Sequence, residues 1–332
     1  MKLLLFALIA TAPLTAFAQA PPAAVVLTTA HFAFYSDLPT NLHDALIAVA
    51  TARRSSRPHP FSATELACIT RLPAAERDAW DRAVDDYVAA RSTSRQRYDE
   101  RMSLAGFVHA DSVADAGDRE FLRQWNALRE AATPAYRQCR WPAQDAVNRQ
   151  WIDRVRTLLS TYEQALGERL PRLFVSTWRG LPFRVDVVND VNFAGANSAD
   201  RADPLTLHIL VSSTNPSNQG LGALEAVFHE ACHYLTLPDS PLSVALRNAA
   251  ERAGATVPPD FLHQVHFFIA GDAVRRVLAD RGETYTPFLF RLKLFSDRFR
   301  DSVSRTWPST VDDQRALDDA ADKLVRAMNA QP

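Results

Sequence analysis

The stretch LEAVFHEACHYL, residues 224–235, carries two histidines four residues apart and a glutamate directly after the first. On an α-helix, residues four apart lie on one face, one turn above the other. His229 and His233 can therefore direct one ring nitrogen each at a single point about 2.0–2.1 Å away, the zinc–nitrogen distance. Glu230 lies about 100° around the helix, where its carboxylate can reach a water on the metal without ligating it. The spacing predicts a catalytic zinc site.

The other residues of this stretch predict that the helix is packed against a core. Two histidines and a glutamate at the edge of such a helix are costly to desolvate without a partner. We therefore interpret the motif as a metal site, and not as a solvated helix that happens to carry polar residues. The apolar stripe consists of Leu224, Val227, Phe228, Ala231 and Leu235.

The motif HEACH (229–233), after a strand and a turn, resembles that of the zincin metallopeptidases. The segment DFLHQVHFFIAGDAVRRVL (260–278) is similar to one found in a set of uncharacterised exported bacterial HExxH proteins. The resemblance covers roughly residues 205–290, with a weaker likeness at FYSDLPTNLHDAL (34–46). It implies a zinc-dependent hydrolase fold in which the two histidines of the motif are ligands and Glu230 is the general base. It implies no particular substrate.

A catalytic zinc takes three protein ligands and leaves a fourth position for water, so a third ligand must be found. The metzincin pattern requires glycine at 236 and histidine at 239, and Thr236 and Asp239 exclude it. The gluzincin pattern takes a glutamate from a following helix, and Glu251 lies 18 residues after His233. Ala255, however, stands where that pattern often has an aspartate.

His263 is the better candidate for the third ligand. It lies in the otherwise apolar stretch FLHQVHFFIAGD (261–272) and falls at the histidine position of the resembling proteins. A lone histidine on an apolar face is often a core residue, but here the site upstream lacks a ligand. His266, one turn further on, is an alternative ligand or a donor to a developing oxyanion. The predicted zinc ligands are His229, His233 and His263, with His266, Glu251 and Asp272 left open for the third position.

Two further features are assigned to catalysis and substrate binding. Tyr285, in GETYTP (282–287), is predicted to donate its hydroxyl to the tetrahedral intermediate, although a tyrosine beside a proline turn is often structural. Together with Glu230 it makes up the predicted catalytic pair. The alternating stretch LTLHILVS (205–212) is an edge-strand candidate that can pair with an extended substrate backbone by strand addition.

The N-terminus predicts export. Met1 and Lys2 lead into an apolar run, and the small residues of TAFAQAPP (15–22) favour signal-peptide cleavage after Ala18. The apolar run is shorter than the ~20 residues of a spanning helix, which argues against the alternative of an uncleaved membrane anchor. We expect a periplasmic or extracellular protein with no integral membrane segment after removal of the signal.

Charge and cysteine content narrow the classes of partner. The 332 residues include 37 Lys plus Arg and 38 Asp plus Glu, a balance that favours neither nucleic acid nor an anionic membrane. Three cysteines are too few for a disulfide-scaffolded miniprotein. Cys68 and Cys139 can pair in an exported chain, a question the sequence leaves open, while Cys232 is expected to be a small buried residue of the motif helix.

The predicted fold class is α+β and predominantly helical, with a zincin-like core of a short mixed sheet plus the motif helix, and a helical N-terminal part. The expected regions are 1–18 (signal peptide), 19–40 (linker and a short strand at 31–37), 41–170 (helical) and 171–332 (metal-binding). In the last region, strands are expected at 172–178, 183–190 and 204–213, and helices at 222–235, 241–253, 258–281 and 287–303.

These features together predict an exported zinc metallopeptidase that acts on a peptide or protein through a metal-activated water. The alternative is a non-catalytic binding protein of the cell envelope with a structural or vestigial metal site. Glu230 argues against the alternative, because a structural zinc site needs no carboxylate beside a water and is normally closed by a fourth protein ligand. Substrate identity, activation and oligomeric state are not fixed by the sequence.

Overall fold

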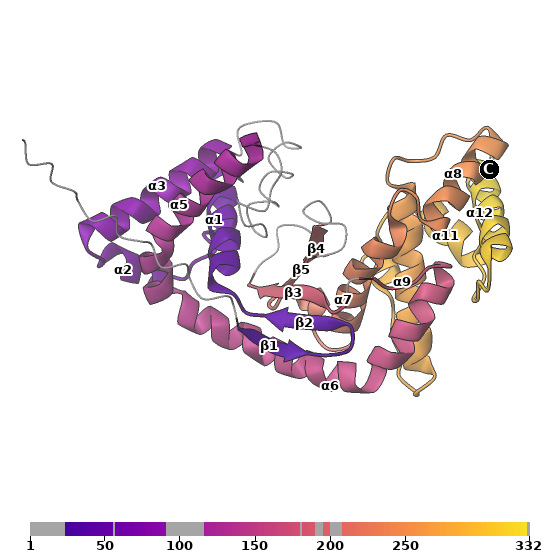
Figure 1. The fold of residues 1–332 in the computed structure, drawn as a ribbon, viewed down its shortest axis with the longest axis horizontal. Helices are drawn as coiled ribbons and strands as arrows, with labels where there is room; N and C mark the ends of the chain where they lie inside the picture. Colours follow the sequence, from indigo (N-terminus) through magenta and orange to yellow (C-terminus); the bar gives the residue numbers. More distant parts are fainter. Residues whose placement is uncertain are drawn as a thin grey trace, which may run out of the picture.

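A computed structural model describes residues 24–55, 57–90, 116–179, 181–189, 195–199 and 208–330. The predicted signal peptide lies outside the described residues. Within them the chain is predominantly helical with a five-stranded mixed sheet (Figure 1), so the predicted α+β class is confirmed. The finer prediction of a zincin-like core stays a prediction.

The bounds of the elements are as follows. The strands are β1 (Val25–Thr28), β2 (Phe32–Tyr35), β3 (Phe183–Val188), β4 (Ala196–Ala199) and β5 (His208–Ser212). The α-helices are α1 (Leu38–Ser55), α2 (Ala63–Thr70), α3 (Ala74–Ala90), α5 (Ala116–Cys139), α6 (Trp141–Leu173), α7 (Gly222–Cys232), α8 (Pro241–Ala253), α9 (Phe261–Ala279), α10 (Phe288–Arg291), α11 (Asp297–Thr306) and α12 (Gln314–Asn329). Two short 3-10 helices are η2 (Pro216–Asn218) and η3 (His233–Thr236).

The strand order in the sheet is β1-β2-β3-β5-β4. The three central strands are parallel, and each outer strand is antiparallel to its neighbour. Of the predicted edge strand 205–212, residues 205–207 lie outside the described residues, and residues 208–212 form β5. The prediction of an edge position is wrong for these residues, because β5 pairs with β3 on one side and with β4 on the other. Among the described residues β4 ends the sheet on that side. Its sequence, ANSA, has none of the β-branched or aromatic residues that favour strands.

One face of this sheet is packed against helices and forms the main core. Successive strand side chains point to opposite faces, so Phe183, Val185 and Val187 of β3 lie on the same face, and all three belong to this core. The core includes residues of α6, α7, α8, α9, α11 and α12. Every residue of α7 is buried, because the helix packs against the sheet, α6 and α9. The motif is therefore part of the core.

A second core is formed by α1, α2, α3 and α5. A disulfide between Cys68 of α2 and Cys139 at the end of α5 ties this group together, which answers the question of pairing left open above. The 33-residue α6 runs along the molecule from this group to the main core (Figure 1). The expected division into two regions at residue 170 stays a prediction. The second half of α6, which precedes that residue, packs in the main core.

Three local predictions differ from the structure. Residues 172–178 form no strand, because α6 continues to Leu173 and Val175 has a left-handed φ of 50°. The predicted helix 287–303 is broken into α10 and α11, since Lys293 and Phe295 have φ values of 51° and 59° that no α-helix can include. The N-terminal strand is a pair, β1 and β2, joined by a short turn.

No helix among the described residues is long and apolar enough to cross a membrane. The disulfide is typical of proteins in an oxidising compartment, which agrees with export. Cys232 is buried and unpaired, as expected for a small core residue.

Candidate metal centre

The first two predicted ligands lie at the C-terminal end of α7. His229 belongs to the last turn of the helix, and His233 follows its last residue with helical backbone angles (φ −55°, ψ −31°). Because the chain keeps turning in the same sense through η3, the i, i+4 relation of the two histidines is preserved. Their ring centroids are 5.3 Å apart.

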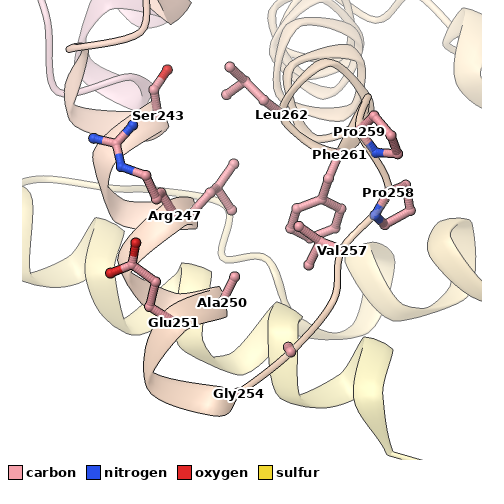
Figure 2. Close-up of a pocket in the computed structure, with 12 residues that line it drawn as sticks. Ser243, Arg247, Ala250, Glu251, Gly254, Val257, Pro258, Pro259, Phe261 and Leu262 are labelled. Carbon is pink, nitrogen blue, oxygen red and sulfur yellow. The ribbon is translucent and has the colours of Figure 1, made fainter.

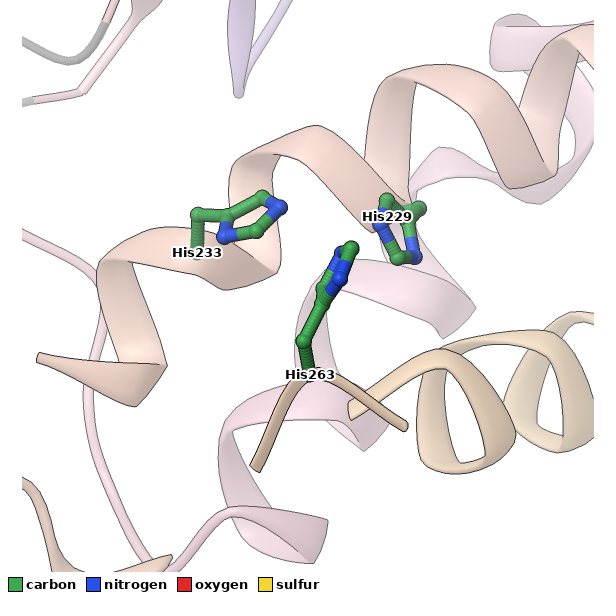
Figure 3. Close-up of side chains that lie close together, drawn as sticks. All are labelled: His229, His233 and His263. Atoms are coloured by element: carbon green, nitrogen blue, oxygen red, sulfur yellow. The ribbon is translucent and has the colours of Figure 1, made fainter. Parts of the chain in front are cut away.

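The third predicted ligand, His263, comes from the first turn of α9, which packs against α7 and η3. One ligand-capable nitrogen from each of His229, His233 and His263 lies within 4.8 Å of the others. Figure 3 shows the ring of His263 reaching toward the space between the other two rings. His229 is buried and the other two are half-buried. The structure thus brings the three predicted ligands together.

The protonation of these rings suits a metal ion. Burial, reinforced by the neighbouring histidines, lowers the pKa of His229 well below the ordinary histidine value, and the pKa of His233 to about 3. Burial also lowers the pKa of His263. All three rings are therefore neutral at pH 7, the form that ligates metals. Nδ1 of His229 is buried and has no hydrogen-bond partner. Three neutral, converging imidazoles fit a zinc-type ion.

His266, an alternative third ligand, packs against His229 and is not one of the converging ligands. Its Nε2–H donates to the backbone carbonyl of His229 over 2.9 Å, because a carbonyl can only accept. The two rings are stacked, with centroids 4.3 Å apart and planes 16° from parallel. This contact fixes the end of α7 that carries the first ligand.

The remaining two alternatives are engaged elsewhere. Asp272 accepts hydrogen bonds from both Arg275 and Arg276 along α9. Glu251 lies on α8 and lines a surface cavity of about 380 Å³ between α8 and the segment 254–262. Figure 2 shows Arg247 and Glu251 on the α8 side of this cavity, with Val257, Phe261 and Leu262 on the opposite side. None of the three converging histidines lines it.

Glu230 is buried beside the three histidines. Its Oε2 is 3.8 Å from Nε2 of His233, and the side chain of Ser198 on β4 hydrogen-bonds to it. Burial raises the pKa of Glu230 to about 8, and the Ser198 hydrogen bond opposes that shift. Ser198 could not be found from the sequence, because it acts only through the pairing of β4 with β5 at the sheet edge.

Tyr285 is hydrogen-bonded to Glu225, which lies on α7 one helical turn before His229. Its hydroxyl donates to Oε2 of Glu225 over 2.6 Å, and the backbone N–H of Phe288 donates to both carboxylate oxygens of Glu225 at 3.0 and 2.9 Å. Glu225 thus anchors the segment leading to α10 against α7. The role predicted for Tyr285, donation to an oxyanion, stays a prediction. The sequence analysis did not identify Glu225. Its position four residues before His229, on the same face of α7, is the sequence signal that could have indicated it.

The burial of Glu225 predicts a pH-dependent stability in the metal-free protein. Burial raises its pKa from near 4.5 to about 7, against the hydrogen bonds from Tyr285 and Phe288. Between these pH values the folded state binds more protons than the unfolded state, so stability falls as pH rises. The wild type should therefore lose about 2.5 kcal/mol of unfolding free energy between pH 5 and pH 8 through this group, and Glu225→Gln should abolish that loss.

The measurement is denaturant unfolding of the chelator-treated wild type and variant at both pH values. Glu230 and the histidines titrate in both proteins, so their contributions cancel in the comparison. Glu251→Gln, a change on an exposed part of α8, is the matched control and should leave the wild-type pH dependence intact. Equal pH dependence in the wild type and Glu225→Gln would contradict the burial argument.

Comparison of the chain with protein-family models, with curated proteins and with solved structures finds no match to any of them. The functional interpretation therefore depends on the geometry of the site.

Proposed function

We propose that the protein is an exported zinc-dependent hydrolase, and specifically a metallopeptidase. The observation that carries the proposal is the convergence of His229, His233 and His263 beside the carboxyl group of Glu230. Three neutral imidazoles form the donor set of a catalytic zinc, and a carboxyl group next to them is the base that hydrolysis requires.

The donor set supports a catalytic site more than a structural one. A structural zinc is closed by a fourth protein ligand, and the group found among the described residues contains three histidines and no fourth ligand. When bound in such an open site, zinc polarises a substrate carbonyl and makes water a stronger nucleophile at neutral pH.

Glu230 then acts as the general base. Burial raises the pKa of its carboxyl group to about 8, but a divalent cation held by the three histidines would favour the ionised form. The ionised carboxylate takes a proton from the attacking water and gives it to the nitrogen of the leaving amine. Ser198 supports this role by holding the carboxylate from the side of the sheet.

The substrate class is proposed from the strand next to Glu230. β4 packs against α7 and ends the described sheet, and Ser198 on this strand contacts the base. An extended peptide that adds to a sheet edge gains main-chain hydrogen bonds, and at β4 it would lie alongside the metal centre. The strand proposed to pair with the substrate is therefore β4, residues 196–199, and not the stretch 205–212 that was predicted from sequence.

The test is the zinc content of the mature protein, purified without a metal-chelating tag. We expect about one zinc per chain in the wild type, because the three histidines form one site. His263→Ala should leave at most a small fraction of that, since two ligands from α7 and η3 alone hold zinc weakly. Glu251→Ala and Asp272→Ala are matched controls in α8 and α9, and both should retain the wild-type content.

Two outcomes would count against the proposal. Wild-type protein that holds no zinc even after supplementation would show that the three histidines are core residues. A His263→Ala variant that is folded by circular dichroism and keeps full zinc would show that the third ligand lies elsewhere.

A further inference from the structure

Two phenylalanine rings lie directly against the metal ligands. The ring of Phe267 on α9 has its centroid 3.9 Å from that of His229 and 5.0 Å from that of His263. The ring of Phe295, between α10 and α11, is 5.6 Å from Phe267 and 6.3 Å from His263. Phe267 is 8% exposed and Phe295 is half-buried. We call this pair the aromatic wall.

The backbone at Phe295 is held in an unusual conformation. Its φ of 59° lies in the left-handed region, which a bulky aromatic residue seldom adopts and which glycine or asparagine tolerates better. The guanidinium of Arg300 donates to the backbone carbonyls of both Leu294 and Phe295 over 2.6 Å. The half-buried side chain of Arg300 thus fixes the turn that places this ring beside His263. Non-glycine residues held in this region cluster at ligand-binding sites.

Residues of β4 contact both the apolar cluster that contains Phe267 and the general base Glu230. Ala196 of β4 packs against the apolar cluster that contains Phe267, and Leu294 and Phe295 pack against the same cluster. Ser198, two residues further along β4 and on the same face, contacts Glu230. Two strand residues span about 6.6–6.8 Å, the distance between alternate side chains of an extended peptide. A peptide paired with β4 would therefore present a side chain to the wall while a neighbouring peptide bond lies near Glu230.

We infer that Phe267 and Phe295 form a specificity subsite that takes a bulky apolar side chain, aromatic or long aliphatic, next to the bond that is cut. The inference rests on the proposed function, because it concerns the same metal centre. The aromatic wall is apolar, because neither phenylalanine ring carries a charge, and its half-buried member is Phe295. Such a subsite discriminates by size and apolarity, since apolar surface removed from water stabilises the complex in proportion to its area.

The experiment compares two small ligands that share one metal-binding group. Acetohydroxamate carries a methyl group beside the hydroxamate, and 3-phenylpropanohydroxamate carries a phenyl group that can reach the wall. Dissociation constants are measured by isothermal titration calorimetry on the zinc-loaded full chain. We expect wild type to bind the phenyl compound about tenfold or more tightly than acetohydroxamate.

The variants change the aromatic wall and leave the three metal-binding histidines in place. Phe295→Asn keeps a residue that tolerates the left-handed backbone and should reduce the preference to about twofold, with acetohydroxamate affinity unchanged. Phe295→Leu keeps an apolar side chain and should retain part of the preference. Phe290→Ala is the matched control, because this ring lies on the neighbouring α10 and packs against Phe268 instead of the histidines. It should keep the full preference.

The outcomes separate this inference from the proposed function. If wild type binds zinc and acetohydroxamate but shows no preference for the phenyl compound, the subsite is refuted and the metal centre stands. A tenfold preference that survives in a folded, zinc-loaded Phe295→Asn variant would likewise overturn it. If zinc-loaded wild type binds neither hydroxamate, there is no open metal position, and the proposed function fails together with the subsite.

Discussion

Replacing Glu230 with glutamine is expected to reduce peptide hydrolysis by about 10²–10⁴-fold, the usual contribution of a positioned general base. Glutamine has the same shape and can still accept a hydrogen bond from Ser198, but it cannot take a proton from water. The three histidine ligands are unchanged, so zinc content should match the wild type. The variant therefore separates catalysis from metal binding.

The measurement is the initial rate on unstructured protein substrate, followed by release of amino termini, with zinc content determined on the same samples. Asp272→Asn is the matched control: it also neutralises a carboxylate, but one paired with Arg275 and Arg276 on α9, and it should hydrolyse at close to the wild-type rate. Hydrolysis by Glu230→Gln at the wild-type rate would show that another group activates the water. Loss of zinc in this variant would show that Glu230 supports the site structurally.

The part of the site that could be predicted is the part fixed by local geometry. His229 and His233 meet because any helix places residues four apart on one face, so their spacing alone was informative. His263 required a longer argument, from the missing ligand and from a histidine in an apolar helix. The structure brings it to the other two through the packing of α9 on α7.

Ser198 and Phe295 lie beyond that kind of reasoning. Ser198 reaches Glu230 because β4 pairs with β5, although the β4 sequence ANSA has no strand pattern. Phe295 reaches His263 because the helix predicted over 287–303 is interrupted at the left-handed residues Lys293 and Phe295, and Arg300 donates to the carbonyl of Phe295 in this turn. Both contacts depend on long-range packing, which overrides local propensity.

The fold shows the same division. The alternating and β-branched stretches FRVDVV and HILVS were predicted as strands and are β3 and β5. Their order in the sheet was not predictable, because pairing joins segments far apart in the chain: β3 pairs with β2, which lies about 150 residues earlier in the sequence. The predicted edge strand, β5, is next to the last strand of the described sheet, so the proposed substrate-binding strand is β4 and not β5.

Breaking the disulfide between Cys68 and Cys139 is expected to lower the free energy of unfolding by about 4 kcal/mol. The bond closes a long loop, with a sequence separation of 71, and the chain-entropy model assigns about that value to a loop of this length. The loss should be confined to the core formed by α1, α2, α3 and α5, because this core is the part that the bond ties together.

Denaturant unfolding of the wild type and of Cys68→Ser combined with Cys139→Ser measures the effect, with zinc content determined in parallel. Zinc content should be unchanged, since the three histidines belong to α7, η3 and α9, outside the disulfide-linked core. Cys232→Ala is the control for changing a cysteine, because Cys232 is buried and unpaired in the motif helix; adding reductant should destabilise it as much as it destabilises wild type. A double variant as stable as wild type would show that the bond adds nothing to the fold, whereas loss of zinc would show that the helical half supports the metal centre directly.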